Sequence, residues 1–206
     1  MKNFIEVGKT EDEQAEQIKK WLRENGPQII AGIVLGLSAI WGFDYYKNYQ
    51  FDQSIEARTH YLSIKGNTDN AEQILRTLQN SHADSAYTQQ AILMMAKHET
   101  DRGNYQEALN YLLPLTSHEQ ALIAHSAKLR AANVYLQIQD YDQALSLLTD
   151  TSNTTFNALY NNTKGDIYIE KGDITAAKKH YQLALDQLPT SSDFNNLIRI
   201  KLNDLN

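Results

Sequence analysis

The apolar and polar positions of this 206-residue chain fall into two unlike regions. Residues 25–43 contain no ionisable side chain, and the stretch Ile29–Phe43 is apolar on every face of a helix. As a helix, residues 25–43 would be about 28 Å long, close to the roughly 30 Å hydrocarbon core of a bilayer. Later in the chain, apolar positions recur at the spacing of amphipathic helices. The pattern predicts a transmembrane helix over residues 27–44 and a helical domain over residues 45–206.

Two other interpretations of the apolar run stay open, because a run of only about 15 residues also suits a buried core helix or a signal peptide. The even distribution of apolar side chains around the helix argues against a core helix. A long segment of mixed charge before the run, with no small-residue cleavage pattern after Phe43, argues against a signal peptide. We therefore expect one uncleaved span, starting at a helix break formed by Asn25-Gly26-Pro27.

Residues 1–26 predict a separate amphipathic helix with Ile18, Trp21 and Leu22 on one side. This helix could lie on the membrane surface or be a short solvated helix without a partner. Lys19, Lys20 and Arg23 cluster just before the apolar run. Since positive charges favour the cytoplasmic side, we expect residues 1–26 in the cytoplasm and residues 45–206 outside it.

Within the apolar run, Gly32 and Gly36 form a GxxxG pattern. Two glycines one helical turn apart let a second membrane helix approach closely, so they are candidate packing residues. The aromatic residues that follow the run fit the outer membrane interface: Trp41, Tyr45, Tyr46 and Tyr49.

The helical domain repeats itself. Turns that begin at Gly103, Asp140 and Gly172 are each followed by an alanine, and these residues, Ala108, Ala144 and Ala177, are 36 and 33 residues apart. This spacing is close to the roughly 34-residue period of the tetratricopeptide repeat, a pair of packed helices. The apolar residues from Phe194 to Leu205 predict a closing helix. The fold class is therefore all-α, one N-terminal transmembrane helix followed by a TPR-like α-solenoid.

A stack of helical pairs leaves a concave surface lined by the first helix of each pair. The repeat register offers a candidate groove for an extended peptide or a partner domain, although some of these residues could be merely solvated. Leu129 occupies the position where carboxylate-clamping repeats carry a lysine, so we expect no clamp for a terminal carboxylate. The candidate groove consists of Leu129, Asn133, Leu136, Gln137, Asn162, Asp166 and Ile169.

Charge and composition exclude several function classes. The net charge of −6 leaves no basic excess for nucleic acid, and the absence of cysteine excludes disulfides, thiol catalysis and thiolate-bound metals. Six histidines are scattered along the chain without a metal-binding spacing. The nearest grouping, His118-Glu119 with His125, is interpreted as a surface feature. No nucleotide-binding or catalytic motif occurs. We expect no catalytic site, cofactor or metal, and hence no enzyme.

The combination of ENGPQII before the span, AGIVLGLSAIWGF within it, DYYKNYQ after it, degenerate repeats and a terminal NNLIRIKLNDL resembles the YfgM family. Members of this family are ancillary subunits of the SecYEG translocon in Gram-negative bacteria. The resemblance implies a single-pass inner-membrane protein with its repeat domain in the periplasm. It also implies association with SecYEG and the periplasmic chaperone PpiD, and assistance to exported polypeptides. A scaffold or assembly factor for another envelope complex is the alternative.

Overall fold

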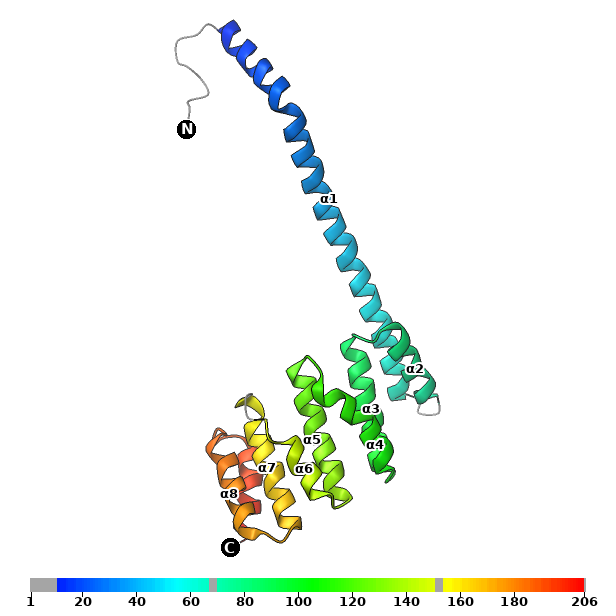
Figure 1. Cartoon of the computed structure of the whole chain (residues 1–206), viewed down its shortest axis with the longest axis vertical. Helices are drawn as coiled ribbons and strands as arrows, with labels where there is room; N and C mark the ends of the chain where they lie inside the picture. The colour runs from blue at the N-terminus through cyan, green and yellow to red at the C-terminus, as the bar shows by residue number, and fades with distance from the viewer. Residues whose placement is uncertain (1–10, 67–69, 151–153, 206) are drawn as a thin grey trace. The chain divides into compact units, whose positions relative to one another are not determined.

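The computed structural model describes residues 11–66, 70–150 and 154–205, and all the regular secondary structure in these ranges is helical (Figure 1). The chain divides into two compact units, Met1–Ile55 and Glu56–Asn206. The prediction of an all-α protein is confirmed. The elements are α1 (Glu11–Gly66), α2 (Ala71–Ser81), α3 (Ala86–Asp101), α4 (Tyr105–Leu112), the 3₁₀ helix η1 (Leu113–Ser117), α5 (Ala121–Gln137), α6 (Tyr141–Leu147), α7 (Thr154–Glu170), α8 (Ile174–Asp186) and α9 (Asp193–Asn203).

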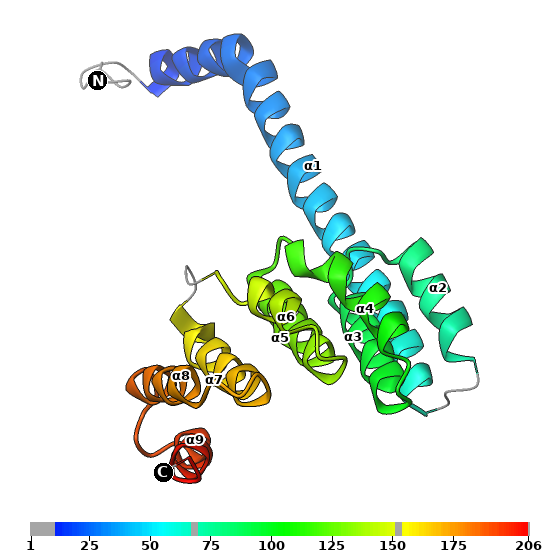
Figure 2. The ribbon, with the colours of Figure 1, turned by 60° about the horizontal axis from the view of Figure 1, so that its bottom comes forward.

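The predicted helix break at Pro27 is wrong, because α1 continues through this residue. Proline removes one backbone donor and crowds the carbonyl four residues earlier, which can kink a helix without ending it. Figure 2 shows α1 bending in its N-terminal, blue part and then continuing. The segment before the apolar run and the run itself therefore form one bent helix.

The apolar run of α1 is exposed along its whole length. Leu35 is 71% exposed and Trp41 is 81% exposed, values unusual for large apolar side chains in water. The helix is long and apolar enough to cross a membrane. Because none of its apolar window is buried within the protein, this part of α1 does not behave as the core helix of a soluble fold. The core-helix interpretation is thereby disfavoured, and α1 fits a membrane anchor.

The second unit consists of packed helical hairpins. Helix α3 packs on α4, α5 on α6, and α7 on α8, and Figures 1 and 2 show these pairs following one another in chain order. The last residues of α1, with α2, form one end of this unit, where Ala57 and Ile64 join a core with Leu75 and Leu78. Helix α9 packs on α8 at the other end. The predicted repeats and closing helix are confirmed.

The turn inside each hairpin has the same backbone conformation. Gly103, Gln139 and Gly172 have φ angles of 80°, 62° and 77°. In each turn this residue donates to the carbonyl three residues earlier and the next residue donates to the carbonyl five residues earlier, as for Gly172 to Ile169 (2.9 Å) and Asp173 to Tyr168 (2.9 Å). This is a Schellman ending, which satisfies the last carbonyls of the first helix. The repeated sequence motif therefore encodes one repeated turn.

Small residues let the helices of a pair approach closely. Ala108, Ala144 and Ala177 are fully buried at equivalent positions of α4, α6 and α8. In the last pair, Gly165 of α7 lies directly against the ring of Tyr181, which is 2% exposed. A Cβ atom at residue 165 would overlap the aromatic carbons of this ring. The hairpin therefore depends on glycine here.

We predict that Gly165→Ala lowers the free energy of unfolding by about 1 to 3 kcal/mol, the usual cost of overpacking a core. The better helix propensity of alanine acts in the opposite direction but is smaller, about 1 kcal/mol. Thermal unfolding followed by circular dichroism measures the effect. Gly42→Ala is the matched control, because a Cβ at residue 42 meets nothing within 4 Å. Equal melting temperatures for Gly165→Ala and the unmodified chain would contradict this packing.

We predict that Gln139→Gly stabilises the chain, by up to about 1 kcal/mol. A side chain in the left-handed region costs about 1 to 2 kcal/mol, and the larger unfolded-state entropy of glycine offsets part of the gain. Urea unfolding measures the change. The reverse substitution at the equivalent turn, Gly172→Gln, should destabilise by a similar amount. A destabilised Gln139→Gly variant would mean that the side chain of Gln139 contributes more than its backbone strain costs.

Candidate functional site

A hollow of about 460 Å³ lies between α3, α4 and α5. Its apolar lining comes from Ala96, Leu112 and Val134, all of which are buried. Around them lie the polar and aromatic side chains Lys97, Thr100, Asp101, Tyr105, Arg130, Asn133 and Gln137. Two of the predicted groove residues, Asn133 and Gln137, are therefore brought together at this hollow.

The charged groups at this hollow already have partners. Lys97 and Asp101 form an ion pair on α3, and the Arg130 guanidinium donates to the carbonyl oxygen of Leu93 at 3.0 Å. Asn133 and Gln137 are one helical turn apart on α5 and exposed. An amide side chain offers both donors and an acceptor, which suits hydrogen bonding to the backbone of another polypeptide. The hollow thus combines an apolar floor with adaptable polar groups and little uncompensated charge.

Three predicted groove residues serve the core. Leu129 and Leu136 pack against the cluster around Ala144, and Ile169 packs against the cluster around Tyr181. All three side chains are only partly buried, so part of each remains accessible to solvent.

Asn162 and Asp166 take part in a network that ties α7 to α8 and α9. The Lys201 ammonium donates to both carboxylate oxygens of Asp166, at 2.7 and 2.9 Å, and to Asn162 Oδ1 at 3.1 Å. The Tyr181 hydroxyl donates to Asp166 at 2.6 Å. Burial, together with this hydrogen bond, raises the pKa of Tyr181. Repeat register alone did not indicate this network, because Lys201 is 35 residues from Asp166 along the chain.

The histidine that was interpreted as a surface residue is buried. His125 of α5 is 4% exposed, stacks on Phe156 at 4.6 Å between ring centroids, and its Nδ1 lies 2.6 Å from the Tyr160 hydroxyl. Burial raises the pKa of Tyr160 to about 12. The interpretation is wrong because sequence spacing did not show that α7 covers this face of α5. The arrangement joins two helical pairs.

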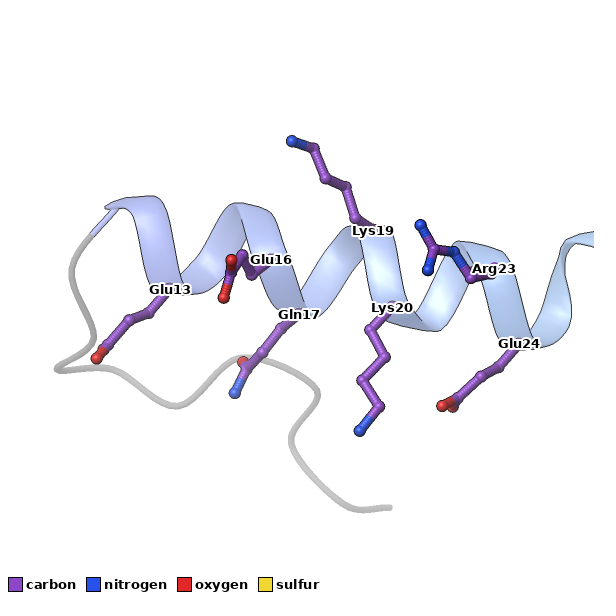
Figure 3. Close-up of a pocket in the computed structure, with 7 residues that line it drawn as sticks. All are labelled: Glu13, Glu16, Gln17, Lys19, Lys20, Arg23 and Glu24. Carbon is purple, nitrogen blue, oxygen red and sulfur yellow. The ribbon is translucent and has the colours of Figure 1, made fainter.

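Two features of α1 were candidates for membrane contacts: the helix face with Gly32 and Gly36, and the amphipathic segment before the apolar run. Both are exposed. Gly32 and Gly36 would accept a Cβ without meeting any atom within 4 Å, so their helix face is free for another helix. Figure 3 shows the charged side chains near the start of α1, where Lys19 and Lys20 point to opposite sides and do not converge on one site. Ile18, Trp21 and Leu22 are exposed, as a helix lying on a membrane surface requires. The first ten residues lie outside the described part of the chain.

One constellation escaped the sequence interpretation. Glu56 and His60 of α1, with His82 after α2, place one potential metal-binding atom each within 4.8 Å of the others. Glu56 and His60 are four residues apart and share a helix face. That spacing was a usable signal, but His82 is separate in the sequence and its approach depends on the packing of α2.

Comparison with known proteins agrees with this architecture. Residues 19–206 match the model of a tetratricopeptide repeat-like domain family. A protein of Neisseria gonorrhoeae named ancillary SecYEG translocon subunit is 30% identical over 204 residues, covering 95% of this chain and 97% of the relative.

Proteins of the same name from other bacteria are also similar along nearly their whole length. The Haemophilus influenzae protein is 29% identical over 200 residues, covering 95% of this chain and 97% of its own length. The Escherichia coli K12 protein is 26% identical over 211 residues, covering 98% and 99%. These relatives are named for a place in a translocon and not for a reaction. The chain belongs to the family of ancillary SecYEG translocon subunits, whose repeat domain is of the tetratricopeptide repeat-like type.

Proposed function

We propose that this chain is a membrane-anchored interaction module of the Sec translocon that assists polypeptides as they emerge from the channel. The observation that carries the proposal is the hollow between α3, α4 and α5, with its apolar floor and the exposed amides of Asn133 and Gln137. Such a surface fits an extended polypeptide of variable sequence, because amide groups bind backbone atoms common to all chains.

The exposed apolar run of α1 supports anchoring beside the channel, in the inner membrane. The positive cluster before the run supports a cytoplasmic N-terminus and a periplasmic repeat domain. In that compartment the chain would work together with SecYEG, the chaperone PpiD and exported polypeptides. The names of the relatives, ancillary SecYEG translocon subunits, support the translocon as partner.

Substitution at Gly32 and Gly36 tests whether this helix face contacts SecYEG. The double variant Gly32→Leu, Gly36→Leu should remain membrane-bound, because leucine favours insertion, but should co-purify less with SecYEG from mild detergent. If close helix packing contributes about 1 to 2 kcal/mol, the yield falls roughly five- to thirtyfold. Gly42→Leu is the matched control on the same helix, at a position that is likewise unobstructed. Undiminished recovery of SecYEG with the double variant would show that this face is not the contact.

Crosslinking from Asn133 and Gln137 tests whether the hollow binds exported polypeptides. Photocrosslinking amino acids placed singly at Asn133 and Gln137 in intact cells should give adducts with many exported polypeptides. The same group at Lys179, an exposed position of α8 outside the hollow, should give few.

The identity of the adducts separates two functions. Many unrelated exported chains support assistance to secretion. If the adducts at both Asn133 and Gln137 contain one and the same partner, they would instead support the scaffold role for another envelope complex. Equal adducts at Lys179 would contradict a binding role for the hollow.

A further inference from the structure

We propose that Glu56, His60 and His82 form a binding site for a divalent transition metal ion, with zinc as the best fit. The site shares no residue with the hollow between α3, α4 and α5, and the proposal does not depend on the proposed role in protein export. Its potential ligand atoms all lie within 4.8 Å of one another. Two imidazoles and one carboxylate are a ligand set that holds zinc in proteins and leaves the fourth position for water.

The distances suit a small adjustment to tetrahedral coordination. His82 Nε2 lies 3.8 Å from a carboxylate oxygen of Glu56. Ligands at about 2.0 to 2.1 Å from a tetrahedral ion lie roughly 3.4 Å from one another. The imidazole rings of His60 and His82 are 6.2 Å apart between centroids and tilted by 41°. Glu56 is exposed and His60 is half-buried, so both side chains have room to rotate toward a shared ion.

An ordinary surface ion pair with Glu56 does not account for the environment of His82. Its side chain is only 4% exposed, and its Nε2 atom is buried without a hydrogen-bond partner among the described residues. The 3.8 Å separation from Glu56 is too long for a hydrogen bond. Buried polar atoms are nearly always paired, because leaving one unpaired costs its full desolvation energy. A metal ion bound by the lone pair of Nε2 would remove that cost.

The backbone around His82 is held in place independently of any ligand. Its N–H donates to the carbonyl of Leu78 at 2.8 Å, and its own carbonyl accepts from Ser85 N at 3.0 Å and from the buried Thr88 hydroxyl at 2.6 Å. The next residue is fixed as well, because the Gln89 side chain donates to the carbonyl of Ala83 at 2.8 Å. The fixed backbone and the burial of the side chain together hold the imidazole beside Glu56 and His60, which is the preorganisation that a metal site needs.

The ion would act as a structural cross-link. Glu56 and His60 flank Ala57, which is fully buried in the core that α1 forms with α2 and α3. His82 follows the last turn of α2, next to the fully buried Leu78. A metal held by all three residues would fasten residues 56–60 of α1 to the turn between α2 and α3. It would thereby close the first end of the repeat domain, opposite the end that α9 covers.

The test uses the full-length chain in detergent, purified with an affinity tag free of histidine, treated with chelator and then supplied with ZnCl₂. We expect about one zinc per chain after gel filtration, measured by elemental analysis. At zinc concentrations about a hundredfold above Kd, the melting temperature of the repeat domain should rise by roughly 5 to 10 °C. A chain that retains no zinc and gains no thermal stability overturns the proposal.

Single substitutions locate the site. His60→Gln and His82→Gln should each weaken zinc binding by at least about a hundredfold, because even losing a residue that only supports a metal ligand costs about 10- to 100-fold. Glu56→Gln should weaken binding as well, and His98→Gln, at a half-buried histidine outside the cluster, should bind like the unmodified chain. If His82→Gln fails to fold, His60→Gln and Glu56→Gln carry the test, since they lie on accessible helix surface. Unchanged affinity in His60→Gln and Glu56→Gln would overturn the proposal.

Discussion

The close approach of paired helices is the constraint on which the repeat domain depends. Each second helix places a fully buried alanine at its contact with the first helix, at Ala108, Ala144 and Ala177. The space beside each contact is filled by larger side chains, such as Tyr181 against Gly165. In interiors packed this densely, adding or removing even one methyl group changes the stability of the fold. Because the separation of the helices is fixed within each pair, the pairs can stack, and a hollow between α3, α4 and α5 becomes part of the rigid fold.

Features encoded by nearby residues could be predicted from the sequence. The repeating turn was visible because Gly103 and Gly172 supply the left-handed conformation and are followed by Asn104 and Asp173, residues that favour helix starts. The turn at Gln139 lacks glycine but was still recognisable from Asp140, whose side chain accepts from the backbone of Gln143. The apolar run was equally clear. Local chemistry and hydrophobic periodicity were sufficient for the fold class.

Features that depend on packing between distant segments could not be predicted. Asn162 and Asp166 occupy groove positions by register, but Lys201 reaches them from α9. His82 faces α1 only because α2 returns along it. In each case the deciding partner lies far away in the sequence or on another element, where spacing along one helix carries no information.

The chemistry of the hollow favours weak, sequence-tolerant contacts over tight recognition. Its cations are already engaged, Lys97 by Asp101 and Arg130 by the carbonyl of Leu93, so little charge remains to select one ligand. What remains is an apolar floor and two exposed amides, which any extended chain can satisfy. In the proposed role, weak binding is sufficient because the membrane tether keeps the hollow close to emerging polypeptides. The effective concentration of such a tethered site is on the order of millimolar. In that role low affinity would be useful, since a bound polypeptide must also be released.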